Sequence, residues 1–215
     1  MTAPPTTVAA YGFEPLVGED QIRVLRLYPG NSGDFLSGHL QHAQLGQLPY
    51  EALSYEWGGG ERSHSIQLQD GRALQITKSL HGALADIRHV PPEGRHRLVW
   101  ADSICINQDD IQERSQQVAL MARIYRRASR VITYIGPERD GSLGAIKLAG
   151  VLRQHAAMRD SPLREEDLAG AGLPPLSDAQ WPALRSLLLR PWVRAVPAAA
   201  NPWFPFPCCR CHVLT

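Results

Sequence analysis

Residues 100–114 hold the densest run of side chains that could do chemistry: Trp-Ala-Asp-Ser-Ile-Cys-Ile-Asn-Gln-Asp-Asp-Ile-Gln-Glu-Arg. Carboxylates such as Asp102 and Glu113 can stabilise the positive charge that develops on a sugar ring when a glycosidic bond breaks. Amide and guanidinium groups beside them can orient hydroxyl or phosphate groups. The pattern predicts catalytic carboxylates at Asp102 and Glu113, and ligand-binding side chains at Asn107, Gln108 and Arg114.

A second segment, residues 50–60, combines aromatic side chains with three consecutive glycines. Tyr55 and Trp57 could stack on a planar ligand, and Gly58 would let the backbone approach it closely. No Lys-Ser or Lys-Thr pair follows the glycines, which excludes a phosphate-binding P-loop. We therefore expect Tyr55, Trp57 and Gly58 to contact the ligand.

Each of these residues also has a structural interpretation. Asp110 and Glu113 fit a capping box, in which Glu113 only closes the start of a helix. Asp102 can serve a turn, Asn107 can tie down loop backbone, and Trp57 can fill the core. If Glu113 is only a cap, Glu113→Gln leaves stability unchanged; if the two segments line one pocket, that substitution abolishes activity.

Hydrophobic patterns predict the elements that position these segments. Asp70-Gly71, between alternating apolar residues, predicts a hairpin over 65–76 with a two-residue turn. The strand–helix–strand order of residues 98–135 predicts a right-handed crossover between adjacent parallel strands. Its helix would cover the sheet with Val118, Met121 and Tyr125. Strands are expected at 22–28, 39–45, 51–55, 98–101 and 130–135, and helices at 77–90, 111–128, 143–158 and 177–190.

These elements predict an α/β fold: a mostly parallel central sheet flanked by helices, with an added β-hairpin. Both candidate segments would follow strands of the sheet. Ligands bind at the carboxyl ends of strands in open α/β sheets, so we expect the two segments to meet at one sheet edge. Asp102 and Glu113 would then face a shared pocket.

Composition and charge exclude several classes of partner. The 215 residues include 22 Lys and Arg against 21 Asp and Glu, so the chain has no basic excess to hold nucleic acid or anionic lipid. The longest uncharged stretch, 195–209, is too short for a membrane span. The first residues lack the pattern of a signal or transit peptide, and a cytoplasmic protein is expected.

The four cysteines are unevenly placed, because three of them lie in the last eight residues. Cys208 to His212 matches the C-x-x-C-H pattern of haem attachment, but a chain without an export signal would not receive haem. We expect a disordered, reactive terminus and no metal site. Cys105, between two isoleucines, is expected to be a buried and inert thiol.

Residues 50–58, Tyr-Glu-Ala-Leu-Ser-Tyr-Glu-Trp-Gly, resemble the opening motif of the fungal heterokaryon-incompatibility (HET) domain, and residues 98–110 resemble its central motif. The resemblance covers residues 48–137. It implies a module that triggers regulated cell death on nonself recognition, through self-association or a protein partner. Further matches follow in the family's order: Glu113-Arg, Gln116-Gln-Val, Met121, Ile124-Tyr125, Ala128 and the strand ending at Gly136.

The same resemblance implies a TIR-like or Rossmann-like sheet, because the HET family is thought to be similar in structure to TIR domains. Some TIR domains cleave nicotinamide dinucleotides, so an NAD-cleaving glycohydrolase is the alternative function. NAD would then be a substrate, and no cofactor is expected.

The family's pattern stops after Arg190-Pro-Trp-Val-Arg194. Beyond it the sequence resembles a foreign or mis-spliced tail on a C-terminally truncated domain, and an inactive fragment is a further alternative. The expected organisation is a flexible lead-in (1–20), a HET-like domain (21–194) and a disordered tail rich in proline and cysteine (195–215).

Overall fold

The computed structural model describes residues 9–31, 33–88, 96–158, 163–195 and 211–214. The described residues fall into two compact units. The first runs to Tyr134 and includes 211–213, and the second begins at Ile135. This boundary lies within the range 21–194 that the sequence suggested as one domain.

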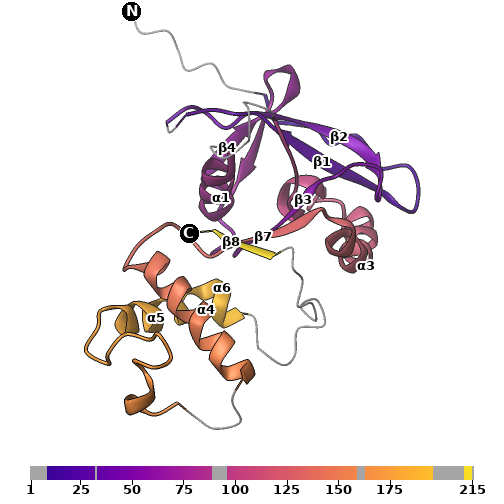
Figure 1. Ribbon diagram of the computed structural model, residues 1–215. Helices are drawn as coiled ribbons and strands as arrows, with labels where there is room; N and C mark the ends of the chain where they lie inside the picture. The colour runs from indigo at the N-terminus through magenta and orange to yellow at the C-terminus, as the bar shows by residue number, and fades with distance from the viewer. Residues whose placement is uncertain (1–8, 32, 89–95, 159–162, 196–210, 215) are drawn as a thin grey trace, which may run out of the picture. The chain divides into compact units, whose positions relative to one another are not determined.

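A six-stranded mixed sheet, in the order β2-β1-β6-β3-β7-β8, forms the centre of the first unit (Figure 1). β3 is parallel to both β6 and β7, whereas β1 is antiparallel to β2 and to β6. The predicted α/β class is confirmed, with parallel strands at the centre of the sheet. The strands are β1 (Gln21–Leu27), β2 (Gly38–Gln44), β3 (Glu51–Ser54), β6 (Arg97–Trp100), β7 (Arg130–Tyr134) and β8 (Cys211–Leu214).

The crossover from β6 to β7 skips one strand, because β3 lies between them. The two strands are parallel in one sheet, as predicted, but the prediction that they are adjacent is wrong. The carboxylate of Glu51 links the central strand β3 to both neighbours, because it pairs with Arg97 of β6 (2.6 Å) and with Arg130 of β7. Burial alone would raise the pKa of Glu51, but hydrogen bonds and charge from Arg97 and Arg130 hold it below its usual value.

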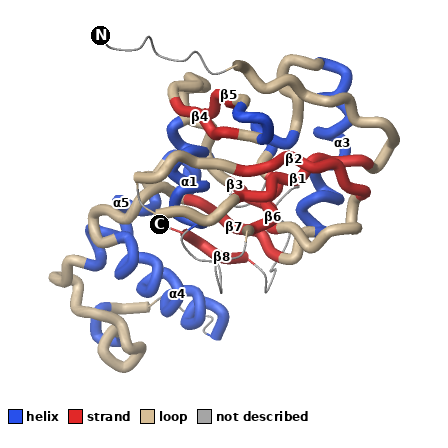
Figure 2. The backbone as a smooth tube through the Cα atoms, turned by 90° about the horizontal axis from the view of Figure 1, so that it is seen from above, coloured by secondary structure: helices blue, strands red, loops and turns tan. Residues whose placement is uncertain are grey.

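Helices α1 (Lys78–Arg88) and α3 (Ile111–Arg127) lie on opposite sides of this sheet (Figures 1 and 2). The Thr77 hydroxyl accepts a hydrogen bond from the Leu80 N–H (3.3 Å), which caps α1. Of the predicted stripe, Val118 is wrong, because it is 45% exposed, whereas Met121 and Tyr125 are half-buried. The Tyr125 ring packs edge to face on Trp100 of β6, with ring centres 5.7 Å apart. The fully buried residues of α3 are Glu113, Gln117, Leu120 and Ile124.

The hairpin of β4 (His64–Gln67) and β5 (Ala73–Ile76) forms a two-stranded sheet of its own. Its register pairs Gln67 with Ala73, so the predicted two-residue turn is wrong. A 3₁₀ turn, Gln69–Gly71, lies within the longer connection. The Gln69 side chain accepts from the Leu40 N–H of β2 (3.0 Å), which holds this residue outside the hairpin ladder.

Two segments outside the expected domain range 21–194 pair with the first unit. Tyr11, in the lead-in, donates its backbone N–H to the Ala73 carbonyl of the hairpin (2.9 Å). Residues 211–214, within the tail, form strand β8. The remainder of the tail, with Cys208 and Cys209, lies outside the described residues, as do the side chains of Cys211 and His212.

The second unit is helical, as the pattern of residues 143–158 and 177–190 predicted. Its helices are α4 (Ser142–Met158), α5 (Gln180–Leu188) and α6 (Pro191–Ala195), with a 3₁₀ turn at Glu165–Asp167. The buried Arg190 guanidinium donates to the carbonyl groups of Ile135 (3.1 Å) and Arg139 (3.2 Å). In the described part of the chain, no helix is long and apolar enough to cross a membrane.

Candidate functional site

Asp102 is the point at which the two candidate segments meet. It begins the short helix α2 (Asp102–Cys105), directly after β6. Its two carboxylate oxygens accept from the Trp57 indole N–H (3.1 and 3.0 Å), and one accepts from the Tyr55 hydroxyl (3.1 Å). β3 and β6 are neighbouring parallel strands, so the chain leaving each of them emerges at the same sheet edge.

Trp57 is 39% exposed, so the interpretation of this residue as a core side chain is wrong. Tyr55, by contrast, is buried. The indole N–H is shared between both oxygens of Asp102, and this hydrogen bond restrains the orientation of the exposed ring. The site therefore presents an exposed aromatic ring that a hydrogen bond to Asp102 restrains.

The charge on Asp102 is in an unfavourable environment. Burial raises the pKa of this carboxyl, and the hydrogen bonds from Trp57 and Tyr55 offset the rise only in part. Burial, followed by the nearby Asp102 charge, raises the pKa of Tyr55 well above its usual value. Groups with perturbed pKa values of this kind concentrate at functional sites.

Asp102→Asn tests this electrostatic environment. A carboxyl whose folded-state pKa is raised binds its proton more tightly in the folded state, so stability falls as pH rises from 3.8 through the folded pKa. We expect the free energy of unfolding of the wild type, relative to Asp102→Asn, to fall over that interval and then stay constant to neutral pH. Urea denaturation of both proteins at a series of pH values measures the difference. A difference that rises with pH would contradict a desolvated Asp102.

Glu113 belongs to a different cluster, centred on Arg23 of β1. The guanidinium donates to both Glu113 oxygens (2.5 and 2.9 Å), to the Cys105 carbonyl (3.3 Å) and to the Glu14 carbonyl. Its carbon lies 5.0 Å from the centre of the Phe13 ring. The two ion-pair side chains are 1% and 9% exposed, so this is a buried salt bridge that joins β1, the lead-in and α3.

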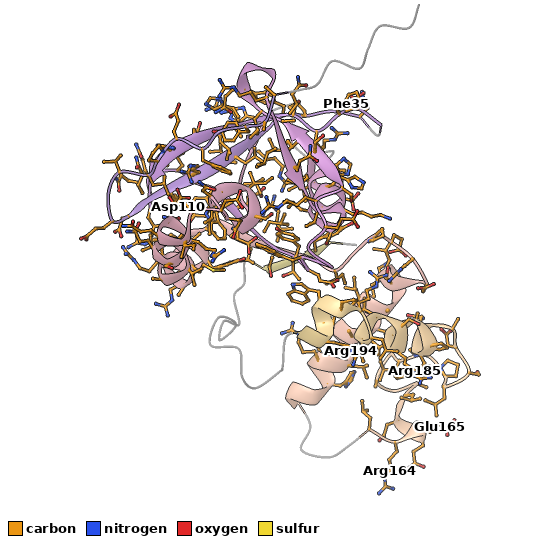
Figure 3. All side chains as sticks on the ribbon, turned by 180° about the vertical axis from the view of Figure 1, so that it is seen from behind. Phe35, Asp110, Arg164, Glu165, Arg185 and Arg194 are labelled. Atoms are coloured by element: carbon orange, nitrogen blue, oxygen red, sulfur yellow. The ribbon has the colours of Figure 1, made fainter. Side chains whose placement is uncertain are left out.

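The predicted capping box is only half present. Asp110, at the start of α3 (Figure 3), accepts from the N–H groups of Gln112 (2.9 Å) and Glu113 (3.0 Å). The Glu113 side chain turns inward to Arg23 and also accepts from the Asn107 N–H (2.7 Å). The expectation that Glu113→Gln leaves stability unchanged rested on the capping role and loses its basis, because Gln cannot neutralise Arg23.

The other predicted site residues mostly hold the loop together. The Asn107 side-chain oxygen accepts from the Asp109 N–H (3.2 Å). Gln108 donates to the Asp102 carbonyl (2.9 Å), and Arg114 donates to the Gln108 carbonyl (3.0 Å). These contacts match the structural interpretation of the loop.

Gly58 has a φ of +69°, a conformation that favours glycine. Open space surrounds the place where its side chain would be. Among the described residues, no group of three or more His, Cys, Asp or Glu side chains could hold a metal ion.

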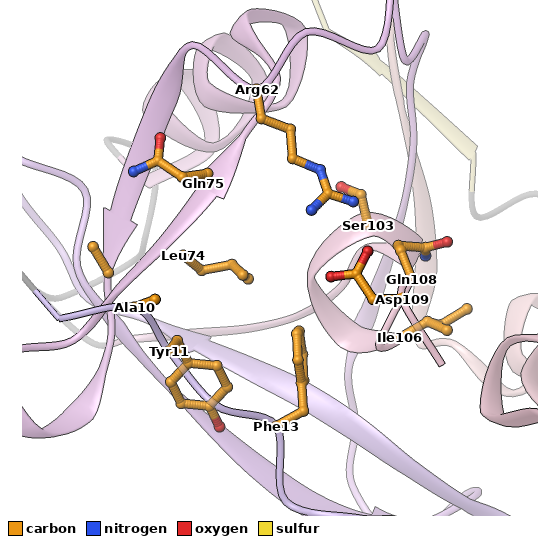
Figure 4. A pocket seen from close by; sticks show the side chains of 11 residues that line it. Ala10, Tyr11, Phe13, Arg62, Leu74, Gln75, Ser103, Ile106, Gln108 and Asp109 are labelled. Atoms are coloured by element: carbon orange, nitrogen blue, oxygen red, sulfur yellow. The ribbon is translucent and has the colours of Figure 1, made fainter. Parts of the chain in front are cut away.

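A cavity of about 200 Å³ lies beside the 103–109 loop, between the lead-in and the hairpin (Figure 4). Gln108 lines it, but Asp102, Glu113 and Tyr55 do not. The predicted meeting of the two segments is therefore present at Asp102, whereas the predicted pocket shared by Asp102 and Glu113 is not this cavity.

Arg23 is the buried charge that the sequence analysis missed. One signal was available: Arg23 shares a strand face with Leu25 and Leu27, both of which are buried. An arginine on an apolar face requires a carboxylate partner. Cys105, in contrast, is buried as predicted, and burial raises the pKa of its thiol to about 12, which makes it inert.

Comparison with known proteins connects this geometry to a family. The heterokaryon incompatibility protein (HET) family model matches residues 50–196. Heterokaryon incompatibility protein 6, OR allele, of Neurospora crassa is 40% identical over an alignment of 132 positions. The match covers 56% of this chain and 19% of that protein. No solved structure matches. The matched region covers more than half of the chain and contains both motifs that meet at Asp102, so the chain belongs to the heterokaryon incompatibility (HET) family.

Proposed function

We propose that this chain is a cytoplasmic effector module that triggers regulated cell death when nonself is recognised. Family membership supports a role in heterokaryon incompatibility. The observation that carries the proposal is the exposed Trp57 ring, fixed by Asp102 where the two family motifs meet. This arrangement suits recognition of another protein, either a partner or a second copy of the chain.

A tryptophan that is 39% exposed leaves apolar surface in water that a core position would bury. Aromatic anchors at protein interfaces recover this free energy on binding, and a ring fixed beforehand loses little conformational freedom. The hydrogen bond to Asp102 restrains the Trp57 ring, although burial disfavours the charged form of the Asp102 carboxyl.

The neighbouring salt bridge of Arg23 and Glu113 has a structural role. Both oxygens of Glu113 are occupied by Arg23, and one also accepts from the Asn107 N–H, so the carboxylate is not available to a substrate. Glu113 is therefore a positioning residue that fixes the loop preceding α3, and the catalytic role predicted for it is not part of the proposal.

A second candidate is the NAD-cleaving glycohydrolase, with a TIR-like arrangement of the fold. It is favoured by one observation: the raised pKa of Asp102 beside an exposed ring that could stack on nicotinamide or adenine. Asp102 would then stabilise the oxocarbenium character of the ribose, and NAD would be consumed as a substrate.

Induced expression of the chain in a filamentous fungus tests the proposal. We expect a loss of colony survival relative to the same strain without inducer. The purified chain, incubated with NAD while nicotinamide release is followed, separates the two candidates: death without nicotinamide release supports the association mechanism, and release supports the glycohydrolase. Full survival with folded protein present would contradict both and support the inactive-fragment alternative.

A further inference from the structure

We propose that the cavity beside the 103–109 loop binds a free α-amino acid with an apolar or aromatic side chain. Its volume of about 200 Å³ is below the ~300–1,000 Å³ of typical sites for drug-sized ligands, which limits the occupant to a small metabolite. Four segments build the cavity: the lead-in, the loop before β4 that carries Arg62, the hairpin and the 103–109 loop (Figure 4). The proposal is independent of cell death, since it concerns binding alone.

The interior of the cavity suits an apolar side chain. Leu74 and Ile106 are buried residues of its lining, and Figure 4 shows the Leu74 side chain and the Phe13 ring directed into the space. The Phe13 ring is fixed by two contacts: it packs on the Arg23 guanidinium, and it meets Tyr11 edge to face with ring centres 5.2 Å apart. A ligand would therefore meet a prearranged apolar surface.

Opposite charges line the same cavity without pairing. Arg62 and Asp109, both exposed, belong to the lining. Within the described residues, no salt bridge or hydrogen bond joins the Arg62 guanidinium or the Asp109 carboxylate to another side chain. Figure 4 shows the Arg62 guanidinium extended toward the loop that carries Ser103 and Asp109. A zwitterion complements this pair, with its carboxylate on Arg62 and its ammonium on Asp109.

Isothermal titration of the purified chain with L-phenylalanine and L-leucine tests the proposal. We expect both to bind. 3-Phenylpropanoic acid lacks the ammonium and 2-phenylethylamine lacks the carboxylate, so each should bind at least about tenfold more weakly than phenylalanine. Equal binding of the three phenyl compounds would show a purely apolar site and overturn the zwitterion assignment.

Two variants locate the site. Arg62→Gln and Asp109→Asn each remove one charge and should weaken phenylalanine binding by at least about tenfold. The matched controls are Arg127→Gln and Asp86→Asn, which alter exposed residues outside the cavity lining and should bind as the wild type does. Failure of either amino acid to bind at millimolar concentration would overturn the proposal, as would equal losses in the site and control variants. If Arg62 and Asp109 pair directly with each other and close the cavity, neither amino acid would bind.

Discussion

Replacing Arg23 by alanine should lower the free energy of unfolding by about 3–5 kcal/mol, because the substitution leaves Glu113 as a buried carboxylate without its counter-charge. The guanidinium also satisfies the backbone carbonyl groups of Glu14 and Cys105, so three segments lose their common partner. Chemical denaturation followed by circular dichroism measures the loss.

The chain contains a matched control in the surface pair of Arg123 and Asp20, with side chains 52% and 43% exposed. Arg123→Ala should cost no more than about 1 kcal/mol, because water screens both charges before and after the substitution. The double variant Arg23→Met/Glu113→Gln, which removes both buried charges, should recover part of the loss. Equal costs for Arg23→Ala and Arg123→Ala would contradict a buried salt bridge that holds the first unit together.

Much of the first unit could be predicted from local patterns. β1, β2 and β3 were expected within one or two residues of their observed bounds, and so were β6 and β7. The meeting of the two motif segments also follows from sequence, because both segments leave strands of one sheet at its carboxyl edge. That inference needs only the parallel order of the strands.

The remaining features depend on contacts between distant residues, which a local pattern does not contain. Asp110 and Glu113 have the spacing of a capping box, yet Glu113 pairs with a residue ninety positions earlier in the chain. Glu51 of β3 likewise pairs with basic residues on two other strands, Arg97 and Arg130. Trp57 could fill a core or lie at a surface, and only the position of Asp102 decides between them.

The proposed cell-death activity depends on the exposed ring of Trp57. Trp57→Ala removes the exposed ring and leaves Asp102 with the Tyr55 and Ser103 donors, so the fold should persist while the surface is lost. We expect cells that express this variant to survive. Phe35→Ala is the matched control, since Phe35 is an aromatic residue of the same unit that is 90% exposed (Figure 3) and lies outside both motifs.

The most direct test is colony survival after induced expression of wild type, Trp57→Ala and Phe35→Ala in the same fungal strain, at equal levels of folded protein. The account predicts that Trp57→Ala restores survival to that of the uninduced strain, whereas Phe35→Ala kills as the wild type does. Killing by Trp57→Ala at the wild-type level would contradict it.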